Sequence, residues 1–189
     1  MSSLLAAALW FATLTAAAGQ LDLQGSTRHG DMPEAHVVVW LESPALPRAL
    51  DSRRTVLDQR NLRFSPRVLA VQVGTTVDFP NNDRVFHNVF SFRDGKRFDL
   101  GLYPIGSVKR VTFDKPGVSR IFCNIHPQMA AYVVAVDSPL FAVSGDTGEF
   151  TLRGVPEGPY TYHAWRAGAQ PLTGSITVRP GQPLDIRWP

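Results

Sequence analysis

Residues 118–136 read VSRIFCNIHPQMAAYVVAV, and this stretch decides the fold. Its two ends, Val118–Cys123 and Ala130–Val136, are short apolar runs rich in β-branched residues, which is typical of buried β-strands. The sequence Asp114-Lys115-Pro116-Gly117, a strong turn signal, stands directly before the first run. The stretch therefore predicts two strands joined by a tight loop over residues 124–129.

Further short strands are predicted on the N-terminal side of this stretch. They are Ala35–Leu41, Arg67–Val73, Thr75–Phe79, Val85–Phe92 and Ser107–Phe113, with turn residues at Gly74 and Pro80-Asn81-Asn82-Asp83. Hydrophobic residues make up 44% of the chain, which is enough for a core, and 15 Gly with 15 Pro are too few for a low-complexity chain. Regularly spaced short strands predict an all-β protein built on a Greek-key β-sandwich.

The sequence outside the main set of strands predicts a second, smaller β-sandwich. Short strands are indicated within residues 148–152, 160–166 and 175–179, but residues 137–189 are few for an independent core and must bury surface elsewhere. Residues 19–34 contain Gly and Pro without periodicity and predict a loose leader, and the polar residues 44–60 predict a long loop. We therefore expect a leader, strand and loop over residues 19–59, a main sandwich over 60–136 and a second sandwich over 137–189.

Residues 1–18 predict a signal peptide. An apolar run from Leu4 to Leu14 is followed by Ala16-Ala17-Ala18, small residues that suit cleavage near Ala18. The run is too short for a finished transmembrane helix, which needs about 20 residues. We therefore expect an exported, soluble chain with no transmembrane segment after cleavage.

Basic residues concentrate in the middle of the chain. Residues 47–120 contain 14 Lys and Arg against seven Asp, although the formal net charge of the whole chain is only +3. This imbalance favours association with an acidic partner at rates that depend on salt, and it is equally compatible with a solvated basic surface. Nucleic acid is excluded as a partner by the predicted export and by the lack of a basic recognition helix or an aromatic RNA-binding motif.

Candidate metal ligands concentrate in the loop, where Cys123, His126 and Met129 have the spacing Cys-x-x-His-x-x-Met. The single cysteine cannot form a disulfide within its own chain, so Cys123 in an exported protein needs another role. A tight loop lets the three side chains converge, and His87, at the start of another predicted strand, can join them. A thiolate, two imidazoles and a thioether form the ligand set of a blue-copper site.

Each of these residue types also occurs in proteins without a metal. A lone Cys is often a buried hydrophobe, a lone Met fills a core and a lone His is often hydrogen-bonded. To exclude a metal site, these separate explanations would all have to apply at once to the candidate ligands. A structural zinc site has little use for Met, and covalent haem needs Cys-x-x-Cys-His, which is absent. A nucleophilic Cys123 activated by His87 or His126 lacks a clear orienting residue. Three further histidines have no ligand spacing: His29, His36 and His163.

Residues 60–136 resemble the plastocyanin-type cupredoxins, and the short cysteine loop is most similar to that of the amicyanins. The matching segments are Phe64–Arg67, Val73–Val77, Phe79–Asp83, His87-Asn88-Val89, Pro116-Gly117 and the loop from Cys123. The resemblance implies one type 1 copper ion held by His87 Nδ1, Cys123 sulfur, His126 Nδ1 and Met129 sulfur. It also implies that Asn88 forms a hydrogen bond near the cysteine loop and holds it.

The C-terminal segment resembles carboxypeptidase-regulatory, transthyretin-like sandwiches. The matching segments are Gly148–Leu152 and Val155–Tyr160. The first strand of such domains is similar to Glu34–Leu41, so this strand is a candidate to pair with the C-terminal segment, with the cupredoxin inserted between them. The whole arrangement is similar to bacterial methylamine-utilisation-type proteins.

These resemblances imply a periplasmic copper protein that is not an enzyme and that transfers single electrons between redox partners by Cu(II)/Cu(I) cycling. An acidic redox protein is the candidate partner. A periplasmic copper carrier or buffer uses the same ligands and stays open as the alternative. A binding role of the C-terminal sandwich rests only on aromatic residues that suit a core equally well: Tyr160, Tyr162, Trp165 and Trp188.

Overall fold

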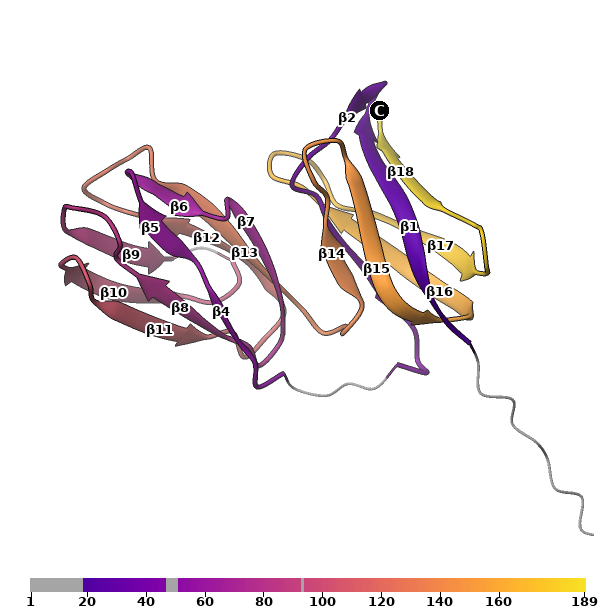
Figure 1. Cartoon of the computed structure of the whole chain (residues 1–189), viewed down its shortest axis with the longest axis horizontal. Helices are drawn as coiled ribbons and strands as arrows, with labels where there is room; N and C mark the ends of the chain where they lie inside the picture. The colour runs from indigo at the N-terminus through magenta and orange to yellow at the C-terminus, as the bar shows by residue number, and fades with distance from the viewer. Residues whose placement is uncertain (1–18, 47–50, 93) are drawn as a thin grey trace, which may run out of the picture.

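The computed structural model describes residues 19–46, 51–92 and 94–189, which form strands and no helix. Two β-sandwiches lie side by side (Figure 1). The middle of the chain, β4 to β13, forms the central sandwich, and the two end segments, β1 to β3 and β14 to β18, form the terminal sandwich. The predicted all-β fold is confirmed, while the predicted signal peptide lies outside the described residues. No helix in the described part of the chain is long and apolar enough to cross a membrane.

The central sandwich consists of a five-stranded sheet, a three-stranded sheet and a two-stranded hairpin. The five-stranded sheet has the order β10-β9-β12-β13-β7, the second sheet has the order β11-β8-β4, and β5 pairs with β6. The strands are β4 (Arg54–Val56), β5 (Asp58–Arg60), β6 (Arg63–Ser65), β7 (Val68–Gln72), β8 (Thr76–Pro80), β9 (His87–Ser91), β10 (Phe98–Tyr103), β11 (Val108–Thr112), β12 (Gly117–Phe122) and β13 (Ala130–Val136).

The alternation of side chains along these strands builds the central core and also directs two candidate ligands into it. Val77 and Phe79 on β8 are fully buried, while Asp78 between them points outward. On β9 the inward row begins with His87 and continues with Val89. On β12 the inward row contains Ile121 and extends to Cys123, just beyond the end of the strand. The sheet therefore places His87 and Cys123 at one end of the core.

The terminal sandwich combines strands from both ends of the chain. One sheet has the order β15-β1-β18 with β2 paired to β1, and the other has the order β14-β3-β16-β17. Its core lies between these sheets and includes Leu23, Leu152 and Ile186. The strands are β1 (Gln20–His29), β2 (Met32–Pro33), β3 (Val38–Glu42), β14 (Phe141–Val143), β15 (Glu149–Pro156), β16 (Gly158–Trp165), β17 (Leu172–Val178) and β18 (Leu184–Trp188).

The structure differs from the sequence expectations in the N-terminal segment, in residues 44–60 and in the number of strands. Residues 19–34 are not a loose leader, because β1 lies between β15 and β18 and supplies core residues. Residues 44–60 are not one long loop, because they contain β4 and β5, so the central sandwich begins at Arg54 and not at residue 60. The strands β2, β6, β10, β14 and β18 have no counterpart among the predicted strands. The strand β1 pairs with residues remote in the sequence, and β4 and β5 are three-residue strands of mostly polar residues, so local periodicity does not reveal them.

The two sandwiches share a third apolar cluster. The outer face of β7, β12 and β13 packs against the outer face of β3, β14 and the end of β16, with Val134, Val136, Val38 and Trp165 buried in the contact. The Tyr132 ring meets the Trp165 ring edge-on at a centroid distance of 5.2 Å. Through this contact, the terminal sandwich buries apolar surface in addition to that of its own core.

We expect Tyr103→Phe to lower the free energy of unfolding by about 1–3 kcal/mol, because it removes a buried hydroxyl that is hydrogen-bonded to two groups. Tyr103 is 2% exposed, its hydroxyl donates to Phe79 O at 3.1 Å, and Gln59 Nε2 donates to that hydroxyl at 2.5 Å. Burial also raises the pKa of the Tyr103 phenol, so it stays neutral and able to donate. Urea denaturation measures the change. Tyr132→Phe, at a half-buried ring in the contact between the sandwiches, is the control; equal losses would contradict the prediction.

Candidate metal centre

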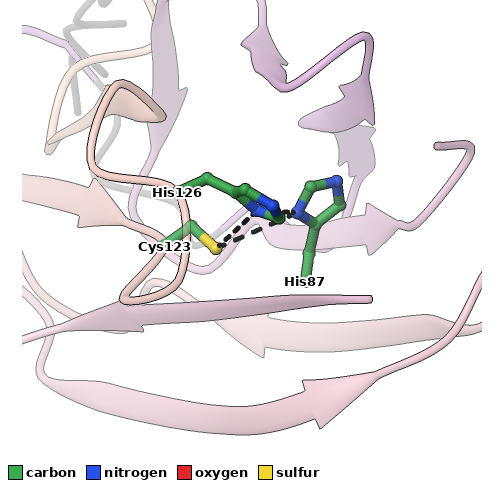
Figure 2. Close-up of side chains that lie close together, drawn as sticks. All are labelled: His87, Cys123 and His126. Atoms are coloured by element: carbon green, nitrogen blue, oxygen red, sulfur yellow. Dashed lines mark hydrogen bonds between the residues drawn. The ribbon is translucent and has the colours of Figure 1, made fainter. Parts of the chain in front are cut away.

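Three side chains, one from a strand and two from the β12–β13 loop, converge at the end of the central core. His87 opens β9, Cys123 follows β12, and His126 lies in the loop that leads to β13 (Figure 2). The two Nδ1 atoms are 3.1 Å apart, and Cys123 Sγ lies 3.9 Å from His87 Nδ1 and 3.7 Å from His126 Nδ1. In the described ranges, these residues are the one group of three or more His, Cys, Asp and Glu that could hold a metal ion.

The size of this triangle matches a metal site. A point equidistant from three atoms separated by 3.1, 3.7 and 3.9 Å lies about 2.1 Å from each of them, the circumradius of that triangle, and protein nitrogen and sulfur ligands bind zinc at about 2.0–2.3 Å. The donors therefore fit a single first-row metal ion without rearrangement. His87 and Cys123 are 0% and 3% exposed, so the scaffold and not solvent sets their positions.

Asp83 determines which nitrogen of His87 faces the triangle. His87 Nε2 lies 3.0 Å from Asp83 Oδ2, and a carboxylate accepts a hydrogen bond, so the proton resides on Nε2. In this tautomer of the neutral ring, Nδ1 carries the lone pair and faces His126 Nδ1 and Cys123 Sγ. A carboxylate partner of this kind fixes the orientation of a metal-binding imidazole.

The loop between β12 and β13 is closed by its own backbone. Met129 N donates to His126 O at 2.9 Å, and Cys123 N donates to Met129 O at 3.3 Å. Asn88 Oδ1 accepts a hydrogen bond from Asn124 N at 3.1 Å, and Asn88 Nδ2 donates to Asp99 Oδ1 at 3.0 Å. Asn88 thereby joins β9 to the residue that follows Cys123. These bonds hold the loop independently of any ion.

Met129, the fourth predicted ligand, lies in the central core. Its side chain is fully buried and belongs to the core cluster that also contains Cys123. The structure thus brings His87, Cys123 and His126 together within bonding range of one ion and places Met129 in the core that supports them. Met129 sulfur as a further ligand stays a prediction from the sequence.

Asp83 is the residue that sequence reasoning missed. The sequence indicates only a turn at Pro80–Asp83, although Asp83 stands four residues before His87, a spacing that allows contact across a short loop. In the structure it accepts hydrogen bonds from Leu62 N at 2.6 Å and Arg84 N at 2.8 Å as well as from His87. It therefore connects three segments around the site.

We expect Asp83→Asn to reduce the stability of the apo protein above about pH 5 and to have less effect in acid. The Leu62 N–H donated to the carboxylate holds the pKa of Asp83 below its usual range, against the opposing effect of partial burial. A lowered folded-state pKa stabilises the fold above the usual aspartate pKa, and this stabilisation disappears as the pH falls through the folded value. Urea unfolding of the apo protein between pH 3 and pH 7 tests this; a difference that does not depend on pH would contradict it.

Exposed apolar side chains flank the candidate ligands. Ile125, next to His126, is 48% exposed, and Phe86, next to His87, is 52% exposed. Asn81 ties the neighbouring loops together, since its side chain donates to Val85 O at 2.9 Å and its carbonyl accepts from Gly106 N at 2.8 Å. Ile105 in the second of these loops is 58% exposed. His126 is only partly buried and reaches this surface.

A family-model match covers the central sandwich. Residues 52–137 match the family model described as copper binding proteins, plastocyanin/azurin family. No curated protein matches the chain.

Similar solved structures include a Cu-containing nitrite reductase from Thermus scotoductus, at 28% identity over 43% of this chain and 22% of that one, with a TM-score of 0.42. A purple cupredoxin from Nitrosopumilus maritimus has 31% identity over 40% of this chain and 84% of its own, with a TM-score of 0.37. Amicyanin from Paracoccus versutus has 20% identity over 52% of this chain and 97% of its own, with a TM-score of 0.40. The chain thus spans about a fifth of the nitrite reductase.

Proposed function

Since the chain is a cupredoxin-like protein whose residues 52–137 match the plastocyanin/azurin family, we propose that it transfers single electrons between redox proteins through a copper site formed by His87, Cys123, His126 and Met129. The family match confirms the prediction of copper from the sequence. The observation that carries the proposal is the triangle of two imidazole nitrogens and one sulfur, which fits one ion and is held by backbone and buried side chains.

The donor set suits copper in both oxidation states. Thiolate and thioether sulfur favour Cu(I), imidazole serves Cu(II) as well, and two imidazoles with one thiolate and a weak axial thioether are typical of blue-copper electron-transfer sites. When bound, copper supplies one-electron chemistry between Cu(II) and Cu(I). The protein supplies fixed positions: Asp83 and Asn88 hold His87 and the cysteine loop in place, so little has to move when the charge of the site changes.

The exposed apolar surface around His126 is the proposed docking site for a redox partner. His126 reaches this surface, and Ile125, Phe86 and Ile105 are each about half exposed. Contacts of this kind bury little area, below about 1,200 Å², and so allow rapid dissociation. The basic centre of the chain favours an acidic partner and speeds its approach.

Two further features belong to the proposal. The apolar run from Leu4 to Leu14 and the alanines that follow support export, with cleavage near Ala18 and a periplasmic location. We also propose that the terminal sandwich is a carboxypeptidase-regulatory-like domain, supported by the pairing of β3 with β14 and β16 in one sheet.

The experiment that tests electron transfer is a redox cycle on purified residues 19–189 loaded with one equivalent of Cu(II). We expect an intense visible absorption band that bleaches with ascorbate, returns on oxidation with ferricyanide and survives repeated cycles. EPR of the oxidised form measures the copper geometry. Copper that binds without this band, or leaves the protein on reduction, would refute electron transfer and favour the carrier or buffer role.

A further inference from the structure

A basic groove lies beside the candidate metal loop. It encloses about 910 Å³ and runs between the β5–β6 hairpin, the start of β7 and the end of the loop. Three arginines line it, two from the hairpin and one just before β7: Arg60, Arg63 and Arg67. Gln128 and Ala130 form its wall on the side of the loop. Because Gln128 stands between His126 and Met129, the groove adjoins the site itself.

The hairpin fixes the position of the arginines. Arg60 and Arg63 are paired across the ladder, and the turn between them uses Asn61 and Leu62 at φ of 52° and 57°. The Leu62 amide donates to Asp83, the same carboxylate that accepts from His87. Arg67 is anchored by its carbonyl, which accepts from Tyr132 N at 2.9 Å. The three guanidinium groups therefore extend from an ordered frame that is hydrogen-bonded to the metal-site residues.

The residues that line the groove contain more positive than negative charges. Asp58 is the one carboxylate among the lining residues, and it accepts from Asn82 Nδ2 at 2.7 Å and from Arg60 Nε at 3.4 Å. Arg63 and Arg67 are exposed and have no carboxylate within 4 Å in the described ranges. Exposed guanidinium groups offer paired N–H donors that match the two oxygens of a carboxylate.

We propose that this groove binds a carboxylate-rich segment of the redox partner, which places that partner against the apolar surface around His126. The inference rests on the proposed electron-transfer function and specifies the chemistry of the partner. A concave site with three guanidinium groups suits an extended acidic peptide, whereas a flat anionic lipid surface would need the charges to project from a convex face. The apolar contacts at His126 then supply the transfer interface, and the groove supplies selectivity and association rate.

The test measures binding of a synthetic twelve-residue peptide of alternating Glu and Gly by fluorescence anisotropy, with residues 19–189 in both the copper-free and the copper-loaded form. The groove variant is Arg63→Gln with Arg67→Gln. The matched control, Arg153→Gln with Arg179→Gln, removes the same charge from exposed positions on the terminal sandwich. We expect the groove variant to weaken binding by about tenfold at low salt and the control by less than about twofold.

Equal weakening in both variants, or no peptide binding by the unmodified protein, would overturn the proposal. So would a preference for phosphatidylserine vesicles over the peptide that depends on Arg63 and Arg67, since it would assign the groove to a lipid surface. Peptide binding needs no copper, so it fails or succeeds separately from the redox cycle. Reversible cycling without peptide binding refutes the groove alone, and groove-dependent binding without cycling refutes electron transfer alone.

Discussion

Replacing Cys123 by Ala abolishes the intense visible band of the copper-loaded protein and leaves the apo fold intact. Cys123 is the single cysteine of the chain, so no other thiolate can take its place. Its sulfur is one corner of the ligand triangle and lies 3.9 Å from His87 Nδ1 and 3.7 Å from His126 Nδ1. Without it two imidazoles and a buried thioether remain, and these give no thiolate-to-copper charge transfer. Visible absorption and EPR after addition of one equivalent of Cu(II) measure the loss.

Met129→Leu is the control for this variant. Leu has a similar volume, so the core cluster around Met129 keeps its packing, and volume-conserving changes of this kind usually cost less than about 1.5 kcal/mol. The band is therefore retained in Met129→Leu, with a changed reduction potential if the thioether is an axial ligand. Circular dichroism of both apo variants establishes that they fold. A band that persists in Cys123→Ala would show that the thiolate is not a copper ligand.

The sequence predicts best those strands whose apolar residues are buried in a core. The apolar run Ala130–Val136 predicts a strand, and β13 has the same bounds. His87 and Cys123 are predictable because their residue types are unusual in such strands, and the structure brings them to one point. The contribution of Asp83 needs the three-dimensional structure, because a carboxylate four residues before a histidine occurs in many turns without contacting it.

The strand β1 shows why local patterns miss other parts. Its neighbours are remote in sequence, since Gln24 pairs with Thr151 and Ser26 pairs with Asp185. Gly25 indicates a loop, but the structure requires glycine there for a different reason. A Cβ atom at this position would lie 2.3 Å from Leu184 O and 2.3 Å from the Phe150 ring. The glycine is thus a consequence of close packing within the sandwich, and local patterns do not distinguish the two causes.

Leu23→Ala tests whether β1 is integral to the terminal sandwich, and we expect it to lower the free energy of unfolding by about 2–5 kcal/mol. Leu23 is 1% exposed and packs in the core shared by β15, β16 and β18. The three tryptophans of the described residues, Trp40, Trp165 and Trp188, all lie on strands of the terminal sandwich, so their fluorescence reports its unfolding.

The copper band supplies an independent signal from the central sandwich, whose core cluster contains no residue of β1. We expect the fluorescence transition of Leu23→Ala to move to lower denaturant concentration by more than the transition of the copper band. Gln24→Ala, at the next and exposed position of the same strand, is the matched control. It should lower the free energy of unfolding measured by fluorescence by less than about 0.5 kcal/mol. Similar transitions for Leu23→Ala and Gln24→Ala would mean that residues 19–29 add little to the core, as their composition alone suggests.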